Sequence, residues 1–417
     1  MKRKKSAEKR GHRRASRRKG RESQEVRGMK LQLDFEPEQS AKIKVVGVGG
    51  AGGNAVNRMI ESGFTGVDFV AVNTDSQALG CCLAPDQVQV GRELTHGLGS
   101  GGNPEIGRRA VEEDAEVVGQ MLNGADMVFI AAGMGGGTGT GGAPVVAKMA
   151  RNMGALVVAV VSKPFLFEGQ YRMRQAVEGL HRLREEVDTS IVIPNQRLLA
   201  VASKDTPIRE AFRIADEVLL RATRGVSDLI MVPGLVNLDF ADVRSVMTGM
   251  GDAVMGTGVS GGKNRAVEAA QQAISSPLLE DQSIVGAAGV LVNVTGGPDL
   301  TLHEISEAAT IINDAIGVET NMIFGAVIDE EVGDEVMITV IATGIKAERK
   351  TAKPEAVKEH ATESQRLRPR QVVKTPPQRA PEPAEAPARN VLVARSSNRR
   401  GSRRDLDIPT FLRRQMD

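Results

Sequence analysis

Glycine and threonine are concentrated between residues 133 and 141, where the sequence reads G-M-G-G-G-T-G-T-G. An apolar run, Met127 to Ala132, precedes this stretch and predicts a buried strand, and Val145 to Arg151 predicts the first turns of a helix. Glycines leave backbone N–H groups uncovered, and a helix start presents further N–H groups with a positive dipole end. The stretch therefore predicts a phosphate site. Thr138 and Thr140 add hydroxyl donors without charge, so we expect Mg²⁺ to balance the phosphates.

A second glycine turn lies nearer the start of the chain. Ile43 to Val48 predicts a buried strand, and a helix is expected from Ala55 to Ser62. Between them, Gly47-x-Gly49-x-x-Gly52 also fits the dinucleotide fingerprint. An oxidoreductase that binds NAD, with Asp75 on the ribose hydroxyl, is therefore an alternative. The P-loop pattern G-x-x-x-x-G-K-[ST] does not occur in the sequence, although residues 261–264 come close to its last part.

Polar residues and a third glycine loop follow the next predicted strand. Val67 to Val72 predicts a strand that ends in Asn73 to Asp75, at the carboxyl end where α/β sheets bind ligands. Residues 97–104 form a glycine-rich loop, and a helix is expected from about Glu105 to Leu122. Ala155 to Val161 predicts a further strand. This alternation predicts an α/β fold with a doubly wound, mostly parallel sheet and several glycine turns along one edge.

The second half of the chain predicts a long helix, an acidic loop and a further domain. Residues 206–228 have a helical apolar period and are expected to connect a first domain, 41–205, to an α+β domain, 229–345. Asp239 and Asp242 stand three apart at a predicted helix start, so their carboxylates can share a face and orient a water molecule or a cation. Acidic residues at a helix start also serve as simple caps, which is the alternative interpretation.

Charge is divided unevenly along the chain. The formal net charge is +2, but residues 1–28 carry a net charge of +10 and residues 346–417 a net charge of +9, which leaves −17 for the body between them. The basic ends could contact nucleic acid, anionic lipid or the acidic bodies of neighbouring subunits, or they could be solvated tails. The adjacent cysteines Cys81 and Cys82, together with the absence of a signal peptide, predict a reducing, cytosolic environment.

Both ends of the chain are expected to lack a fixed fold. Residues 1–40 read as a basic, mostly disordered extension, although Met29 could be the true start. Residues 346–404 are rich in Pro, Ala, Arg and Glu and read as a disordered linker. Within the last segment, residues 405–417, Leu406 to Leu412 brings back an apolar cluster, which predicts a peptide that docks onto a partner.

Taken together, these motifs resemble the tubulin/FtsZ superfamily, and bacterial FtsZ in particular. The resemblance covers Ile43 to about Ile345 and the last dozen residues. The matching stretches are Gly47 to Asn54, Asn73 to Asp75, Gly97 to Pro104, Gly135 to Gly141, Phe167 to Gly169 with Arg172, Ala211-Phe212, Asn237 to Val243 and Leu406 to Leu412. The basic segment before Met29 departs from the usual pattern, and Gly102 replaces a commoner Ala.

The resemblance implies a GTPase that polymerises head to tail and forms the cytokinetic ring. By similarity, Phe212 stacks on guanine and Asp216 accepts hydrogen bonds from its edge, while Glu168 and Arg172 contact the ribose and phosphate side. Asp239 and Asp242, with Asn237, would complete the GTP site of the next subunit. The implied GTP/GDP contacts are Gly50, Ala51, Gly52, Gly53, Asn54, Asn73, Asp75, Gly135, Gly136, Gly137, Thr138, Gly139, Thr140, Gly141, Glu168, Arg172, Phe212 and Asp216.

The resemblance also implies partners and a place in the cell. The terminal peptide would bind membrane-tethering division proteins of the FtsA, ZipA or SepF type, so contact with the membrane would be indirect, and no specific nucleic acid is expected. The protein would be cytoplasmic and concentrated at the mid-cell division site. A scaffold that binds GTP without hydrolysing it is a further alternative, less expected because both acids of the loop are present.

Overall fold

A ten-stranded sheet organises the part of the chain that the computed structural model describes: residues 41–200, 203, 205–232, 234, 238–279, 284, 286–317, 320–329 and 332–345. The strand order is β3-β2-β1-β4-β5-β6-β7-β10-β8-β9. Seven of the strand pairs are parallel, and only β10 pairs antiparallel, with β7 and β8. The predicted N-terminal extension, linker and docking peptide, and also Asn237, lie outside the described residues.

The first six strands form the parallel half of the sheet. Their bounds are β1 (Ile43–Val48), β2 (Asp68–Asn73), β3 (Asp86–Gln89), β4 (Met127–Gly133), β5 (Leu156–Lys163) and β6 (Thr189–Pro194). Successive residues such as Val45 and Val46 are both fully buried, because helices cover both faces of the sheet. The chain moves from β1 outward to β2 and β3, and later from β4 outward to β5 and β6. The direction of winding therefore reverses between β1 and β4, which is the topological switch point of the sheet.

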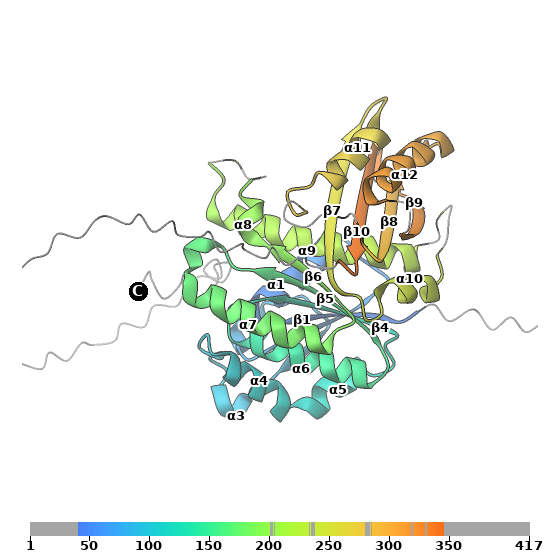
Figure 1. Cartoon of the computed structure of the whole chain (residues 1–417). Coiled ribbons are helices and arrows are strands. Elements are labelled where there is room, and N and C mark those ends of the chain that lie inside the picture. Colours follow the sequence, from blue (N-terminus) through green and yellow to red (C-terminus); the bar gives the residue numbers. More distant parts are fainter. Residues whose placement is uncertain are drawn as a thin grey trace, which may run out of the picture. The chain divides into compact units, whose positions relative to one another are not determined.

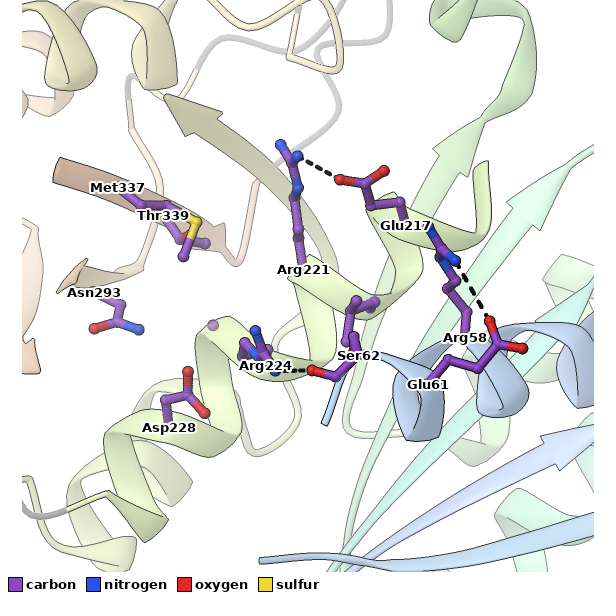
Figure 2. Close-up of a pocket in the computed structure, with 12 residues that line it drawn as sticks. Arg58, Glu61, Ser62, Glu217, Arg221, Arg224, Asp228, Asn293, Met337 and Thr339 are labelled. Carbon is purple, nitrogen blue, oxygen red and sulfur yellow. Dashed lines mark hydrogen bonds and ion pairs between the residues drawn. The ribbon is translucent and has the colours of Figure 1, made fainter. Parts of the chain in front are cut away.

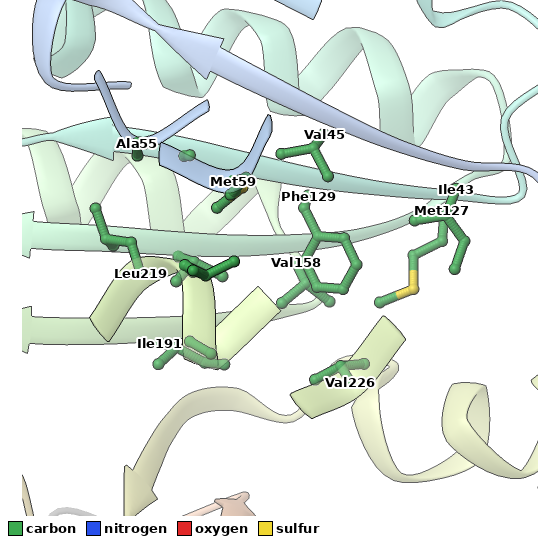
Figure 3. Close-up of a cluster of buried hydrophobic side chains, with 14 of the residues drawn as sticks. Ile43, Val45, Ala55, Met59, Met127, Phe129, Val158, Ile191, Leu219 and Val226 are labelled. Atoms are coloured by element: carbon green, nitrogen blue, oxygen red, sulfur yellow. The ribbon is translucent and has the colours of Figure 1, made fainter. Parts of the chain in front are cut away.

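Helices cover each face of this half through a separate apolar cluster. Val45, Phe129 and Val158 face Met59 of α1 and Leu219 of α9, as Figure 3 shows. On the other face, the alternate strand residues pack against α4, α5, α6 and α7. The helix bounds are α1 (Gly49–Glu61), α2 (Ser76–Gly80), α3 (Arg92–Thr95), α4 (Pro104–Glu113), α5 (Ala115–Leu122), α6 (Thr138–Asn152), η1 (Leu166–Glu168), α7 (Gln170–Glu186), α8 (Asn195–Leu198) and α9 (Ile208–Met231).

Three helix boundaries differ from the sequence prediction. Helix α1 begins at Gly49 and α6 at Thr138, so both helices include glycines that the sequence assigned to turns. The helix expected over residues 105–122 is two helices, α4 and α5. They break at Asp114, whose carboxylate accepts a hydrogen bond from the N–H of Gly91 at 2.7 Å. Tertiary contacts thus decide these boundaries against local propensity.

The second half is a smaller α+β domain. After α10 (Phe240–Met247) it contains β7 (Gly251–Gly261), α11 (Arg265–Ile274), β8 (Gly289–Gly296), α12 (Leu302–Ile316), β9 (Asn321–Ile328) and β10 (Glu335–Thr343). The sequence predicts strands at Gly289 to Thr295, Asn321 to Val327 and Glu335 to Thr343, close to β8, β9 and β10, but none at β7. Strand β7 pairs with β6 over only three residues, 189–191 with 251–253. Helix α9 also contacts strands of both halves (Figure 1). The predicted fold class, a doubly wound, mostly parallel sheet followed by an α+β domain, is confirmed.

Among the described residues, no helix is both long and apolar enough to cross a bilayer.

Candidate nucleotide site

The N-termini of α1 and α6 meet at the switch point between β1 and β4. Helix α1 follows directly from the carboxyl end of β1, and α6 follows the carboxyl end of β4 after residues 134–137. A Cβ placed at Gly49 would lie only 2.8 Å from the backbone nitrogen of Gly139, so the two helix starts are in close contact. Because the first N–H groups of a helix have no partner within the helix, this edge of the sheet presents two sets of donors and two positive dipole ends. An anionic group is the ligand that such an arrangement favours.

Several glycines of the two turns are required by packing. A Cβ at Gly52 would overlap the carbonyl oxygen of Ala131, and a Cβ at Gly139 would lie 2.7 Å from the carbonyl oxygen of Gly133. A Cβ at Gly141 would overlap the carbonyl oxygen of Pro104, at the start of α4. These glycines let α1, α6 and α4 approach the sheet and one another, so their presence alone does not indicate a ligand.

Other glycines of the turns face open space. Positions for a Cβ at Gly50 and Gly53 have no described atom within 4 Å, and the same holds for Gly101 and Gly102 in the neighbouring loop. At Gly136, the nearest atom is in the guanidinium group of Arg172, at 3.8 Å. At Gly50, Gly53 and Gly136 packing does not explain glycine, whereas a ligand lying close against the backbone would; at Gly101 and Gly102 the positive φ itself favours glycine. We call the N-termini of α1 and α6, with this open surface, the cradle.

The threonine hydroxyls have partners within the protein. The Thr138 hydroxyl lies 2.7 Å from the Thr74 hydroxyl and 3.0 Å from the Ser100 hydroxyl. The Thr140 hydroxyl accepts a hydrogen bond of 2.8 Å from the N–H of Gly135. The sequence analysis expected both threonines to offer hydroxyl donors to phosphates. In the structure these hydroxyls also brace the turns, so a hydroxyl contact with phosphate stays a prediction, beside the N–H groups of the two helix starts.

Asn73 and Asp75 also organise the loops beside the cradle. The side-chain oxygen of Asn73 accepts hydrogen bonds from the N–H groups of Thr74 and Asp75. Asp75 caps α2 by accepting from the N–H groups of Gln77 and Ala78, and its backbone forms a β-bridge with Leu98. The two residues therefore bring the loop of residues 97–103 against the cradle.

Glu168 and Arg172 form an ion pair on the β5 side of the cradle. An Arg172 N–H donates to the Glu168 carboxylate at 2.8 Å, and the N–H of Phe165 donates to the other oxygen at 2.8 Å. Burial raises the pKa of Glu168, and these two donors oppose the shift. A Cβ at Gly135 would lie 2.8 Å from the carbonyl oxygen of Arg172, so the pair borders the glycine turn.

Aromatic rings and a carboxyl group extend the site toward α9. The ring of Phe165 stacks on Phe167 at 5.0 Å and meets the edge of Phe212 at 5.4 Å. Asp216 lies one helical turn after Phe212 on α9 and is half-buried. Burial raises the pKa of Asp216 to about 7, with Arg58 opposing the shift. A planar ring with hydrogen-bond donors on its edge fits this combination of aromatic surface and acceptor.

Asn195 is a candidate that the sequence analysis did not identify. It begins α8 at the carboxyl end of β6, and its buried side-chain oxygen has no hydrogen-bond partner among the described residues. The next residue, Gln196, accepts from the N–H of Leu166, which places Asn195 beside the Glu168 segment. A buried acceptor without a partner is costly, so a ligand donor is a natural complement. The sequence did contain one signal for Asn195: it is a polar residue directly after the apolar residues of β6, just as Asn73 ends the apolar run of β2.

The two acids of the second half lie elsewhere. Asp239 caps α10 by accepting from the N–H of Asp242 at 2.7 Å, and both residues are exposed. Arg244 donates to the carbonyl oxygen of Gly154, just before β5, and Thr189, the first residue of β6, donates to α10. Helix α10 thus lies at the amino ends of the strands, while the cradle lies at their carboxyl ends (Figure 1). The seven residues of β4 alone span roughly 23 Å between these edges.

A cavity of about 380 Å³ lies apart from the cradle, between α1, α9 and the strands β8 and β10 (Figure 2). Its walls include the ion pairs Arg58–Glu61 and Arg221–Glu217. Burial raises the pKa of Asp228 in this cavity to about 7. None of the glycine-turn residues lines it. A doubly wound sheet with two helix N-termini and an open glycine surface at its switch point instead defines an α/β nucleotide-binding protein.

Comparison with known proteins identifies the family. Residues 42–203 match the GTPase domain of the tubulin/FtsZ family, and residues 251–346 match the C-terminal domain of the FtsZ family. An empty FtsZ dimer from M. jannaschii is 46% identical, with a TM-score of 0.72, over 75% of this chain and 90% of that chain. CetZ2 from Haloferax volcanii, solved as a GTPγS-bound protofilament, is 25% identical, with a TM-score of 0.62, over 73% and 94%. The chain therefore belongs to the tubulin/FtsZ family as an FtsZ-type GTPase that binds GTP and GDP.

Proposed function

We propose that the chain assembles head to tail into filaments and hydrolyses GTP at the junction between subunits. The observation that carries this proposal is that the cradle and the Asp239/Asp242 pair lie at opposite edges of one sheet. One chain cannot bring its own acids to its own cradle, but stacking the α10 edge of one subunit on the cradle of the next would. CetZ2, which was solved as a protofilament, is consistent with such stacking.

In this proposal the cradle holds the phosphates of GTP. The unpaired N–H groups at the starts of α1 and α6, including those of Gly50 to Gly52 and Thr138 to Thr140, would donate to the phosphate oxygens, and Gly53, Asn54 and Gly141 would lie against the phosphates. Glu168 and Arg172 would contact the ribose and phosphate side. Mg²⁺ would neutralise charge on the terminal phosphates.

The guanine base would lie between the aromatic cluster and α9. Phe212 would stack on the ring, while Asp216 would accept from its N1–H and amino group, a donor pair that adenine lacks. The unpartnered side-chain oxygen of Asn195 would be a further acceptor for the base. This arrangement favours GTP over NAD. One oxygen of the Asp75 carboxylate, which an NAD site would need on the ribose, already caps α2.

Chemistry would then depend on the neighbouring subunit. Its Asp239 and Asp242, with Asn237, would orient the attacking water or a cation beside it. Loss of the γ-phosphate would remove contacts at the junction, so hydrolysis would weaken the filament there. Because the two contacting surfaces differ, the contact is heterologous and need not close, which gives an open filament.

Attachment and location follow from the last residues of the chain. Leu406 to Leu412 would bind tethering proteins of the FtsA, ZipA or SepF type, and aligned subunits would convert a weak contact into firm attachment. The filaments would form the cytokinetic ring in the cytoplasm at mid-cell, with the membrane contacted only through the tethers.

Sedimentation with GTP, GDP or NAD, combined with phosphate release, tests the proposal. Filaments that form with GTP and release phosphate support it. Filaments without phosphate release would identify a scaffold that binds GTP without hydrolysis, and a response to NAD without one to GTP would support the oxidoreductase alternative.

A further inference from the structure

Three buried hydroxyls from three separate loops meet beneath the cradle. Thr138, the first residue of α6, lies in hydrogen-bond contact with Thr74, which follows β2, and with Ser100, in the middle of the loop of residues 97–103. All three residues are at least 93% buried. A Cβ at Gly137 would overlap the Ser100 hydroxyl, so the loop lies directly against the start of α6. We call these three groups the hydroxyl triangle.

The same loop is attached firmly at its two ends. At one end, Gly97 accepts from the N–H of Ser76, and Leu98 forms the β-bridge with Asp75. At the other end, Asn103 caps α4. Between these anchors lie Gly101 and Gly102, which have positive φ and open space at their Cβ positions. Ser100 is therefore the point where the middle of the loop is bonded to the helix that carries the cradle.

We propose that Ser100 is a positioning residue that latches the loop of residues 97–103 to α6 through Thr138 and so slows the release of bound nucleotide. This inference rests on the proposed function, because it takes the cradle as the phosphate site. The hydroxyl itself does not need to touch the nucleotide. Its bond holds the loop beside the N–H groups of α6, in addition to the bond that the Gln175 amide of α7 donates to the carbonyl oxygen of Gly102 at 3.2 Å. A tip that moves away from α6 leaves the phosphates less enclosed.

Release of a fluorescent GDP analogue, measured at concentrations too low for assembly, tests the latch. Because one hydrogen bond is lost, Ser100→Ala should release GDP about fivefold faster, with little change in the association rate. Ser275→Ala is the control, because it also deletes a hydroxyl that bonds a helix: the Ser275 hydroxyl, just after α11, donates to the carbonyl oxygen of Gln271. This variant should release GDP at the wild-type rate. Equal release rates for Ser100→Ala and the wild type would overturn the proposal.

A change of the bonding partner separates a latch from a general loss of stability. Thr138→Val removes the central hydroxyl of the triangle, so adding Ser100→Ala to this variant should change the rate of GDP release little further. Thr138→Ser keeps the hydroxyl, so adding Ser100→Ala to that variant should raise the rate of GDP release as much as in the wild type. A Ser100→Ala effect that is undiminished in Thr138→Val would contradict the latch. Hydrogen exchange of the loop in nucleotide-free protein gives a second test, because it should be faster in Ser100→Ala even if the protein bound no GTP. Absence of GTP binding by the wild type would instead refute the proposed function.

Discussion

The position of Asp242 makes replacement of this residue the sharpest test of catalysis across the junction. Its carboxyl group is exposed, and its backbone N–H, not its side chain, makes the capping bond to Asp239. Asp242→Ala should therefore change the free energy of unfolding by no more than about 0.5 kcal/mol. GTP binding should also survive, because the cradle lies at the other edge of the sheet. Phosphate release should fall by about 10²- to 10⁴-fold, the usual contribution of a group that orients or deprotonates the nucleophile.

The assay compares GTP binding with phosphate release above and below the assembly concentration. Ser245→Ala is the matched control, because Ser245 is exposed on the same helix and bonds only the backbone of Asp242. This control should retain both GTP binding and hydrolysis. Loss of GTP binding by correctly folded Asp242→Ala would contradict the assignment, because it would place the carboxylate in the nucleotide site of its own chain.

Mixed filaments decide which subunit supplies the acids. Asp242→Ala loaded with γ-labelled GTP is mixed with an equal amount of wild type and an excess of unlabelled GTP. In random head-to-tail order, about half of the labelled cradles face a wild-type neighbour, so labelled phosphate should appear at about half the wild-type rate per labelled site. No release of label from the mixture would refute hydrolysis across the junction, and so would equal turnover per molecule in dilute and concentrated wild type.

Three further predictions test individual groups. Burial raises the pKa of Asp216 to about 7, and guanine should bind the ionised carboxylate. The affinity for GTP should therefore fall by up to about tenfold per pH unit below 7. Asp216→Asn should not show this pH dependence. Gly52→Ala should lower the free energy of unfolding by about 1–3 kcal/mol through overlap with backbone, as denaturation would show. Gly53 lies in the helix and a Cβ there meets no described atom, so Gly53→Ala should not lower the free energy of unfolding, but it should weaken nucleotide binding in a titration. Arg265 bonds Glu304 and lowers the pKa of that carboxyl to about 2. The stability that this pair contributes should be fully present above about pH 4, the usual carboxyl pKa, and should be lost as the pH falls through 2. In Arg265→Met the pair is absent, so acid denaturation should not show this loss of stability.

The sequence predicted those parts of the fold that depend on local pattern. Strand β1 has the predicted bounds, because a short apolar run before glycines is distinctive. The predicted starts of α1 and α6 were wrong because Gly49 and Gly139 are helical through close packing of these two helices against each other and against β1 and β4. Local helix propensity does not reveal such tertiary packing. Strand β7 was missed for a similar reason. A Cβ at Gly256 or Gly258 would overlap α11, so packing requires glycines that weaken the strand signal.

The candidate site divides in the same way. A backbone site at a glycine turn can be predicted from sequence, because the turn is built from neighbouring residues. The partners of the Thr138 hydroxyl cannot, because Ser100 and Thr74 are distant in sequence and meet only after the sheet has formed. Asn195 was missed because its significance lies in a buried oxygen without a partner in the described part of the chain, a property of the fold. The residues that orient a site are thus harder to predict than those that line it.

Winding direction links the chemistry of this protein to its proposed assembly. In a parallel sheet every strand runs the same way, so the ligand-binding loops lie together at the carboxyl edge. A long connecting helix can carry the chain back, so that the segment after the helix lies at the amino edge. Helix α9 leads from the proposed base site to α10 in this manner, since its first half carries Phe212 and Asp216 and its end leads to Asp239. In the proposed assembly, a chain built this way exposes complementary halves of one reaction centre on opposite surfaces. Two copies facing each other symmetrically would join like halves and leave both sites incomplete, so only a head-to-tail order completes each site.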